Sequence, residues 1–363
     1  MRICLMGDAR SPHIVRLGSM LARSVEHVHV VSHKPGRIPG AEVEVFKIPG
    51  PGFRNPRRWA ARREHYLRGF MRDFDVVNVH FLHDWGWHPS LMSDGCFVAT
   101  PWGSDIVPPP GEVGPDASTI ERRRLILRHA SGVQVVGPSF AESVSTFAGL
   151  SPDQVDVVPW GINLRMFDRT RFPNERDRLK IGFFKGFRAV YGAEFLIRAI
   201  PQIVKRHPDV QFDMIGDGAE YDACVALAES LGVADNITWW GTLAQWQLPA
   251  VMATWRMSVI PSLHEAFGMA AVESMAMSVP VVASHVGGLP DSVVHHETGL
   301  LVPPENPDAL ATAIVELIES PGFCRRLGRN GRRYAERYHD GQLCLEQQLA
   351  SYAACLDRAC VTV

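Results

Sequence analysis

The sequence lacks the cysteine patterns of a disulfide-rich domain. Its 363 residues include seven cysteines, an odd number, and these are scattered without any Cys-x-x-Cys pair. This distribution argues against a disulfide framework and against a cysteine-ligated zinc site, and it is typical of a reducing compartment. We therefore expect a cytoplasmic protein.

Long apolar runs and several ligand-binding motifs are also missing. No apolar run reaches the ~18 residues that span a bilayer, and a strand-like segment follows Met1 directly, so we expect neither a membrane span nor a signal peptide. No Gly-x-Gly-x-x-Gly follows that segment, which counts against a dinucleotide oxidoreductase. No Asp-x-Asp triplet stands at the end of a predicted strand to hold a divalent ion, so we expect no bound metal ion. We expect no resident cofactor either.

The composition is that of an ordinary globular protein. Hydrophobic residues make up 46% and charged residues 21% of the chain, and the formal net charge of −2 indicates no general preference for nucleic acid or membranes. A chain of 363 residues exceeds the size at which a single core stops growing. We therefore expect two domains.

Strand-like and helix-like segments alternate along both halves of the chain. Strands are predicted at residues 1–7, 27–32, 75–80, 97–106 and 132–138, and again at 179–184, 213–218, 236–241, 256–261 and 299–303. This alternation predicts an α/β fold with parallel, doubly wound sheets, which bind ligands at the carboxyl ends of their strands.

Residues 261–280, PSLHEAFGMAAVESMAMSVP, are the most informative stretch. Glu265 and Glu273 do not align on one straight helix, because eight steps of roughly 100° leave them ~80° apart. We therefore place Glu265 on a loop and Glu273 inside a helix that begins near Gly268. Unpaired amides at such a helix start bind anions, so the segment suits a nucleotide sugar, with phosphates between two sets of hydroxyls. The alternative is that both glutamates are solvated helix charges.

This pattern resembles the EX7E region of the GT-B glycosyltransferases of family 4, which reads P-S-x-x-E-x-F-G-x-x-x-x-E-x-x-A followed by P-V-V-A and G-G. The matching residues are Pro261, Ser262, Glu265, Phe267, Gly268, Glu273, Ala276, Pro280, Gly287 and Gly288. Residues 155–167, VDVVPWGINLRMF, resemble a second element of that family, V-x-x-I-P-x-G-V-D-x-x-x-F. The resemblance extends over essentially the whole chain.

The resemblance implies a GT-B fold, in which two Rossmann-like, doubly wound domains face a central cleft. We expect an acceptor-binding domain at residues 1–168 and a donor-binding domain at 169–341. A carboxyl-terminal helix near 342–363 is expected to pack back on the first domain. The implied reaction is a retaining, metal-independent transfer of a sugar from a nucleotide-diphospho-sugar, with UDP-sugars favoured.

The family grips the donor diphosphate with an arginine and a lysine about six residues apart. The arginine position falls on Lys185, and the lysine position falls on Tyr191, which carries no cation. We expect Lys185 and Arg188 to supply the two charges, and the alternative is a solvated basic loop. The catalytic candidates are thus Lys185, Arg188 and Glu265.

The resemblance also assigns donor-binding roles. Glu265 would accept hydrogen bonds from the donor sugar and Glu273 from the ribose, with backbone amides of the helix start facing sugar and phosphate. Gly216 and Gly218 would let the backbone approach the nucleotide, with tight turns as the alternative, and residues 240–243 would pack by the base. The donor-binding candidates are Glu273, Phe267, Gly268, Met269, Gly216, Gly218, Gly241 and Leu243.

On the acceptor side, the family usually carries a histidine-glycine-x-aspartate-like element. Here Trp102 stands at the histidine position, while Gly103 and Asp105 are retained, so the usual role of that histidine does not carry over. His80 and His83 are candidate replacements, with a structural role as the alternative. The acceptor-side candidates are His13, His80, His83, Trp102 and Asp105.

The segment from Arg54 to Arg72 is rich in arginine and has aromatic residues at helical spacing. It is either a solvated helix face or a docking surface for an anionic membrane or a charged acceptor. Membrane docking would place the protein at the inner face of the membrane. The expected partners are a nucleotide-sugar donor and a carbohydrate, lipid-linked or natural-product acceptor, and no nucleic acid.

There are two competing hypotheses. One is another GT-B activity, such as that of a phosphorylase or a sugar-nucleotide epimerase. The other is a non-catalytic sugar-nucleotide-binding protein.

Overall fold

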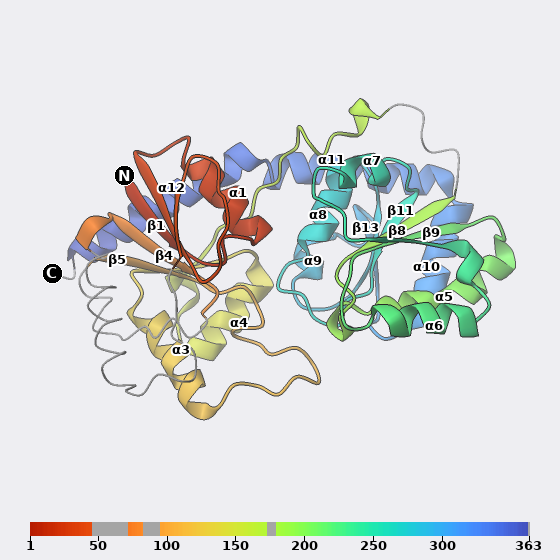
Figure 1. The fold of residues 1–363 in the computed structure, drawn as a ribbon, viewed down its shortest axis with the longest axis horizontal. Coiled ribbons are helices and arrows are strands. Elements are labelled where there is room, and N and C mark those ends of the chain that lie inside the picture. Colours follow the sequence, from red (N-terminus) through yellow and green to blue (C-terminus); the bar gives the residue numbers. More distant parts are fainter. Residues whose placement is uncertain (46–71, 83–94, 173–178, 362–363) are drawn as a thin grey trace. The chain divides into compact units, whose positions relative to one another are not determined.

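The computed structural model describes residues 1–45, 72–82, 95–172 and 179–361 (Figure 1). The chain divides into two compact units. The first comprises Met1–Pro108, Glu112–Trp160 and Gln342–Val363, and the second comprises Pro109–Gly111 and Gly161–Gly341. The predicted membrane-docking segment lies almost entirely outside the described residues, as does His83. Among the described helices, none is both long enough and apolar enough to cross a bilayer.

The described strands of the first unit form one parallel sheet in the order β3-β2-β1-β4-β5-β6-β7. Its strands are β1 (Arg2–Met6), β2 (His27–Ser32), β3 (Glu42–Val45), β4 (Val76–His80), β5 (Cys96–Thr100), β6 (Gly132–Val135) and β7 (Val155–Val157). Its helices are α1 (Pro12–Leu21), α3 (Ala117–His129), α4 (Pro138–Ala148) and α12 (Gly341–Val361). The central strands β4 and β5 are buried along their whole length, as expected for a parallel sheet covered on both faces.

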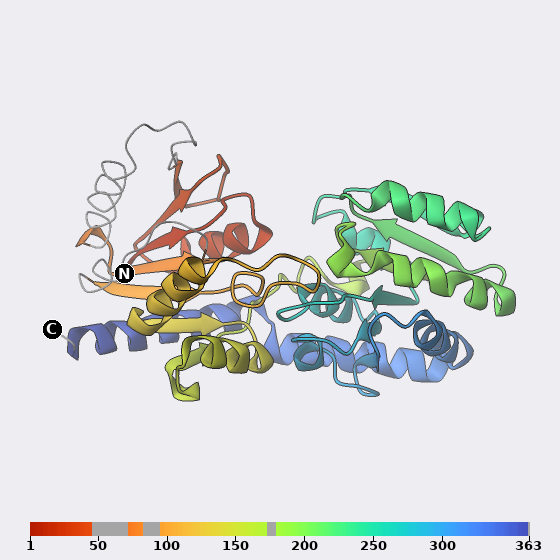
Figure 2. The same cartoon turned by 90° about the horizontal axis from the view of Figure 1, so that it is seen from below.

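Helix α12 completes the core of this unit. Tyr352 and Cys355 belong to the same buried cluster as Ile3 and Leu5 of β1. Figure 2 shows the blue carboxyl-terminal helix lying along the sheet, beside the strands drawn in orange. Helix α12 therefore packs in the first unit, as expected for residues 342–363.

The described strands of the second unit form a parallel sheet in the order β10-β9-β8-β11-β12-β13. Its strands are β8 (Lys180–Phe184), β9 (Gln211–Ile215), β10 (Ile237–Gly241), β11 (Met257–Ile260), β12 (Val281–Ser284) and β13 (Gly299–Val302). Its helices are α5 (Ala193–Arg206), α6 (Tyr221–Ser230), α7 (Leu248–Met252), α8 (Met269–Ala276), α9 (Leu289–Ser292), α10 (Pro307–Glu319) and α11 (Pro321–Tyr338). Figure 1 shows α5, α6 and α10 on one face of this sheet and α7, α8 and α11 on the other.

The second unit begins at Gly161, before the predicted boundary after residue 168. Two hydrogen bonds, one from a backbone N–H and one from an arginine side chain, give the reason. The N–H of Ile162 donates to the carbonyl of His339 at 2.9 Å, and Arg332 donates to the carbonyl of Phe167 at 2.6 Å. Residues 161–168 are therefore attached to the second unit, although in sequence they continue the family element at the end of the first.

Candidate active site

Loops at the carboxyl ends of neighbouring strands in the second unit form the candidate active site. Strands β8, β11 and β12 are adjacent in the sheet, and parallel strands present their following loops at one edge. The loops after β8 and β11 are joined by a hydrogen bond from the Leu263 N–H to the Val190 carbonyl, at 2.8 Å. The loops after β11 and β12 are joined by one from the Gly288 N–H to the Glu265 carbonyl, at 2.9 Å.

Glycines allow these loops to approach closely. Gly287 has a φ of 48°, and a Cβ there would overlap the carbonyl oxygen of Glu265. Gly216 has a φ of 139°, and a Cβ there would overlap the carbonyl oxygen of Lys185. Both positions therefore require glycine. In this structure the close neighbour of Gly216, which we expected to face a nucleotide, is the backbone of the loop after β8.

Helix α8 begins next to this junction. Glu265 lies on the loop and Glu273 inside the helix, in the positions inferred from the sequence. The N-cap Gly268 has a φ of 96°, and within the described residues no side chain caps the first turn of α8. Phe267 is buried, its ring centre lies 5.2 Å from that of His339, and its carbonyl accepts the Ser292 hydroxyl at 3.0 Å. The first turn thus offers backbone amides and the positive end of the helix dipole.

Lys185 and Glu265 form an ion pair at the centre of the site. Both side chains are largely buried, with 12% and 13% of their surfaces exposed. The hydroxyl of Ser262 donates to the same carboxylate of Glu265 at 3.3 Å. Burial lowers the pKa of Lys185 to about 7, while the negative charge of Glu273 acts in the opposite direction. A buried ion pair of this kind is costly to keep, which is typical of a functional site.

Tyr191 supports the two cations of the site. The Lys185 Nζ lies 4.2 Å from the centre of the Tyr191 ring, and the Arg188 guanidinium carbon lies 5.9 Å from it. The position where the family carries a lysine thus presents an aromatic surface to Lys185 and Arg188. From the sequence alone, Tyr191 was notable only because it carries no positive charge at this position.

Glu273 is held by a residue that sequence analysis did not identify. The side-chain amide of Gln245 donates to Glu273 at 3.1 Å. Gln245 follows Gly241 and Leu243 in the loop between β10 and α7. Gly241 adopts a φ of 62° and accepts the N–H of Gly216 at 2.9 Å, which ties this loop to the one after β9. The only hint in the sequence is the two-residue distance of Gln245 from the predicted Leu243.

The acceptor-side candidates that the structure describes gather in the first unit. The ring of Trp102 lies 5.4 Å from that of His13 and 5.4 Å from that of Trp160, and the rings of His13 and Trp160 are 4.1 Å apart. All three are partly exposed, so they form an aromatic surface. Trp160 was not among the residues selected from the sequence.

Two candidates in this group, Asp105 and His80, are buried and hold the loop that carries Trp102. Asp105 is buried, and its carboxylate accepts N–H bonds from the backbones of Leu82, Trp102 and Gly103 at 2.8–2.9 Å. Burial raises the pKa of Asp105, although these hydrogen bonds act against the rise. The residue therefore organises the loop that carries Trp102 and does not present a carboxylate to an acceptor.

His80 is also buried, and its Nδ1 accepts the indole N–H of Trp102 at 3.3 Å. Burial lowers the pKa of His80 to about 3, with the charge of His13 acting in the same direction. His80 is therefore a neutral imidazole near pH 7 that orients Trp102. This placement agrees with the structural role that was the alternative for His80.

Comparisons with known proteins agree with this architecture. The family model described as Glycosyltransferase Family 4 matches residues 11–165, and that described as Glycosyl transferases group 1 matches residues 166–334. The MMP alpha-(1->4)-mannosyltransferase of Mycolicibacterium hassiacum is 31% identical over 330 residues, which cover 85% of this chain and 77% of the relative. The D-inositol 3-phosphate glycosyltransferase of Segniliparus rotundus is 31% identical over 227 residues, covering 60% of this chain and half the length of that relative.

Solved structures share the fold over nearly the full length. A glycosyltransferase from Rickettsia africae has a TM-score of 0.83 at 16% identity and covers 98% of both chains. The Anabaena protein HepE in complex with UDP has a TM-score of 0.76 at 19% identity and covers 98% of this chain and 100% of its own. Both Rossmann-like units, the matched family models and the mannosyltransferase relative lead to one assignment. The chain belongs to the GT-B glycosyltransferases of family 4 and is an enzyme that transfers sugars.

Proposed function

We propose that the enzyme takes its sugar from a nucleoside-diphospho-sugar, with UDP-sugars favoured, and transfers it with retention of configuration and without a metal ion. The observation that carries this proposal is the buried Lys185–Glu265 pair beside the uncapped start of α8. A cation and a helix start stabilise a leaving diphosphate, and a carboxylate beside them accepts hydrogen bonds from sugar hydroxyls.

The proposed reaction breaks the bond between the anomeric carbon and the diphosphate oxygen. Lys185, Arg188 and the first-turn amides of α8 stabilise the negative charge that develops on the diphosphate. An acceptor hydroxyl attacks the same face of the sugar, and its proton passes to a phosphate oxygen of the leaving group. No protein base is needed in this scheme, and Glu265 orients the sugar. Glu273, steadied by Gln245, binds the ribose.

For the acceptor we propose a molecule with a sugar or cyclitol ring. The rings of His13, Trp102 and Trp160 form a partly exposed aromatic surface in the first unit, on which the apolar face of such a ring can pack. The names of the relatives are consistent with this class, since they refer to an inositol phosphate glycosyltransferase and a mannosyltransferase. HepE has been crystallised with UDP and with UDP-glucose, which supports a uridine donor as the first to test.

Calorimetric titration with UDP-glucose, GDP-mannose and ADP-glucose tests the donor. We expect one of the three to bind, and the Glu273→Gln variant to bind it at least about tenfold more weakly, because a hydrogen bond to a charged group is lost. Glu229→Gln, an exposed glutamate of α6, is the matched control and should bind as the wild type does. Binding that is unchanged by both Glu273→Gln and Lys185→Ala would contradict the proposed site. Turnover should persist with a chelator, and NMR of the product should show the anomeric configuration of the donor.

A further inference from the structure

A cluster of histidine and glutamate side chains lies on the sheet of the first unit, apart in the chain from every residue of the donor site. His27 and His29 come from β2, and Glu42 and Glu44 come from the neighbouring strand β3. Side chains two residues apart on a strand share a face, and His29 is directly opposite Glu42 in the parallel register. The intervening Val28, Val30 and Val43 belong to or pack against the buried core on the other face.

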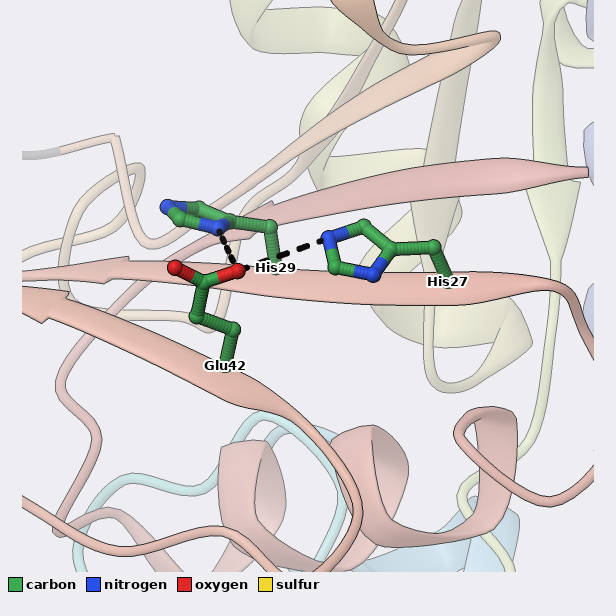
Figure 3. A group of neighbouring side chains, drawn as sticks. All are labelled: His27, His29 and Glu42. Carbon is green, nitrogen blue, oxygen red and sulfur yellow. Dashed lines mark ion pairs between the residues drawn. The ribbon is translucent and has the colours of Figure 1, made fainter.

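Ring nitrogens of His27 and His29 lie near one carboxylate oxygen of Glu42. The Glu42 Oε2 lies 3.8 Å from the His27 Nε2 and 3.6 Å from the His29 Nδ1. Figure 3 shows this single carboxylate oxygen facing both imidazole rings. One ligand atom from each residue lies within 4.8 Å of those of the other two.

We propose that His27, His29 and Glu42 form a binding site for a divalent transition metal ion, with Zn²⁺ the best match. Two imidazoles and one carboxylate are a donor set that Zn²⁺ uses, with water in the fourth position. Bonds of about 2.0–2.1 Å in a tetrahedron place neighbouring ligand atoms ~3.4 Å apart. The two distances to Glu42 therefore need to shorten by only a few tenths of an ångström, and the imidazoles must also move toward each other.

Glu44 supplies the second feature of a metal site. Its Oε2 lies 3.1 Å from the His29 Nε2, the ring nitrogen opposite the one that faces Glu42. A histidine that donates one ring N–H to a carboxylate keeps the lone pair of its other nitrogen for a metal. Glu44 thus fixes the ring orientation and the tautomer that the proposed site requires.

The exposure of the cluster permits entry of an ion. Glu42 is 66% exposed and His27 is 37% exposed, while His29 is largely buried beside the ring of Phe74, 5.6 Å away. The site is therefore open to solvent on the side of Glu42 and His27, while packing holds the ring of His29 in place. A metal ion there would link β3 to β2 and stabilise the end of the described sheet. The scattered cysteines and the missing Asp-x-Asp triplet led us to expect no metal ion. The proposed site instead uses the His-Val-His and Glu-Val-Glu patterns of β2 and β3.

Titration of the full-length, chelator-treated protein with Zn²⁺ tests the proposal, with Co²⁺ absorption as a report on ligand geometry. We expect the wild type to bind one Zn²⁺ per chain. His27→Gln or Glu42→Gln should lower the affinity for Zn²⁺ at least ~100-fold, and Glu44→Gln should lower it about tenfold. His129→Gln, an exposed histidine of α3, is the matched control and should bind as the wild type does. Zn²⁺ should also raise the Tm of the wild type more than that of His27→Gln.

The altered side chains of His27 and Glu42 are both substantially exposed, so the variants should fold, and circular dichroism verifies this. Absence of Zn²⁺ binding by the wild type would overturn the proposal. So would binding that is equally tight in folded His27→Gln and Glu42→Gln. Sugar transfer is not needed as a readout, so the result is independent of the proposed donor chemistry.

Discussion

Burial and neighbouring carboxylates shift the pKa of Lys185 in opposite directions. Burial disfavours the ammonium form, whereas Glu273 and the ion pair with Glu265 favour it. The family carries an arginine at this position, and a guanidinium keeps its charge at any pH that a protein tolerates. A lysine with a lowered pKa makes the proposed diphosphate clamp dependent on pH in a way that an arginine would not.

The first prediction concerns this pH dependence. Because the pKa of Lys185 is lowered to about 7, its ammonium form prevails below that pH and the neutral amine prevails above it. If the diphosphate requires the ammonium, kcat/KM for the donor should fall up to tenfold per pH unit above about 7. Lys185→Arg should shift the fall to higher pH or remove it. Lys205→Arg, an exposed position on α5, serves as the control. Superimposable profiles for the wild type and Lys185→Arg would show that Lys185 does not titrate in the reaction.

The second prediction concerns Trp102. Replacement by alanine removes the ring that contacts His13 and Trp160 and that hydrogen-bonds to His80. We expect kcat/KM for the acceptor to fall about tenfold, in line with the free energy of a well-packed aromatic contact. Donor affinity by calorimetry should stay unchanged, because the donor-site residues lie in the other unit. A loss confined to donor affinity would contradict the aromatic surface as an acceptor site.

At the scale of elements, the donor site is built from loops held against one another by backbone contacts. The segment of residues 261–280 was placed correctly as a loop followed by a helix, because its local pattern of proline, glycine and apolar spacing determines both. Most of the alternating strands were predictable for the same reason, but β3 and β7 were not among the predicted strands. The roles of Gln245 and Asp105 were not predictable, since each depends on a contact with a residue distant in sequence. Tyr191 contacts Lys185 and Arg188 of its own loop, and this contact depends on the loop conformation. The burial of His80 likewise follows from packing within the unit and from no local signal.

The third prediction tests the contact between the loops after β11 and β12. Gly287→Ala introduces a Cβ against the carbonyl of Glu265 at a φ of 48°. We expect a loss of stability of about 1–3 kcal/mol and weaker donor binding, because the loop that carries Glu265 must move. Gly322→Ala is the matched control, since its Cβ would meet no atom within 4 Å. Thermal melts and calorimetry measure both effects. Unchanged donor affinity in Gly287→Ala would show that the loop contact does not position Glu265.

At the scale of the whole molecule, the chain leaves the first unit at Trp160 and returns to it at Gln342. The returning helix α12 is held by a buried polar network. The Asn78 amide donates to the Tyr352 hydroxyl at 2.7 Å, and the Gln348 amide donates to Gln134 at 2.7 Å. Thr100 donates to Asn78 at 2.8 Å. Buried polar groups need such partners, so the network specifies one position of α12 on the sheet.

The fourth prediction follows from this network. Tyr352→Phe removes one of the two acceptors of the Asn78 amide inside the core and leaves only Gln134, at 3.3 Å. The buried N–H that loses its partner should destabilise the first unit by about 1–3 kcal/mol. Hydrogen exchange followed by mass spectrometry resolves the two units, and we expect faster exchange in β1, β4 and β5. Exchange in β8, β9 and β11 and donor binding should remain as in the wild type, because these belong to the second unit. Tyr338→Phe, at a residue 44% exposed, is the control and should change neither unit. If Tyr352→Phe accelerates exchange equally in both sheets, the two units unfold together, and α12 couples their stabilities as well as completing one core.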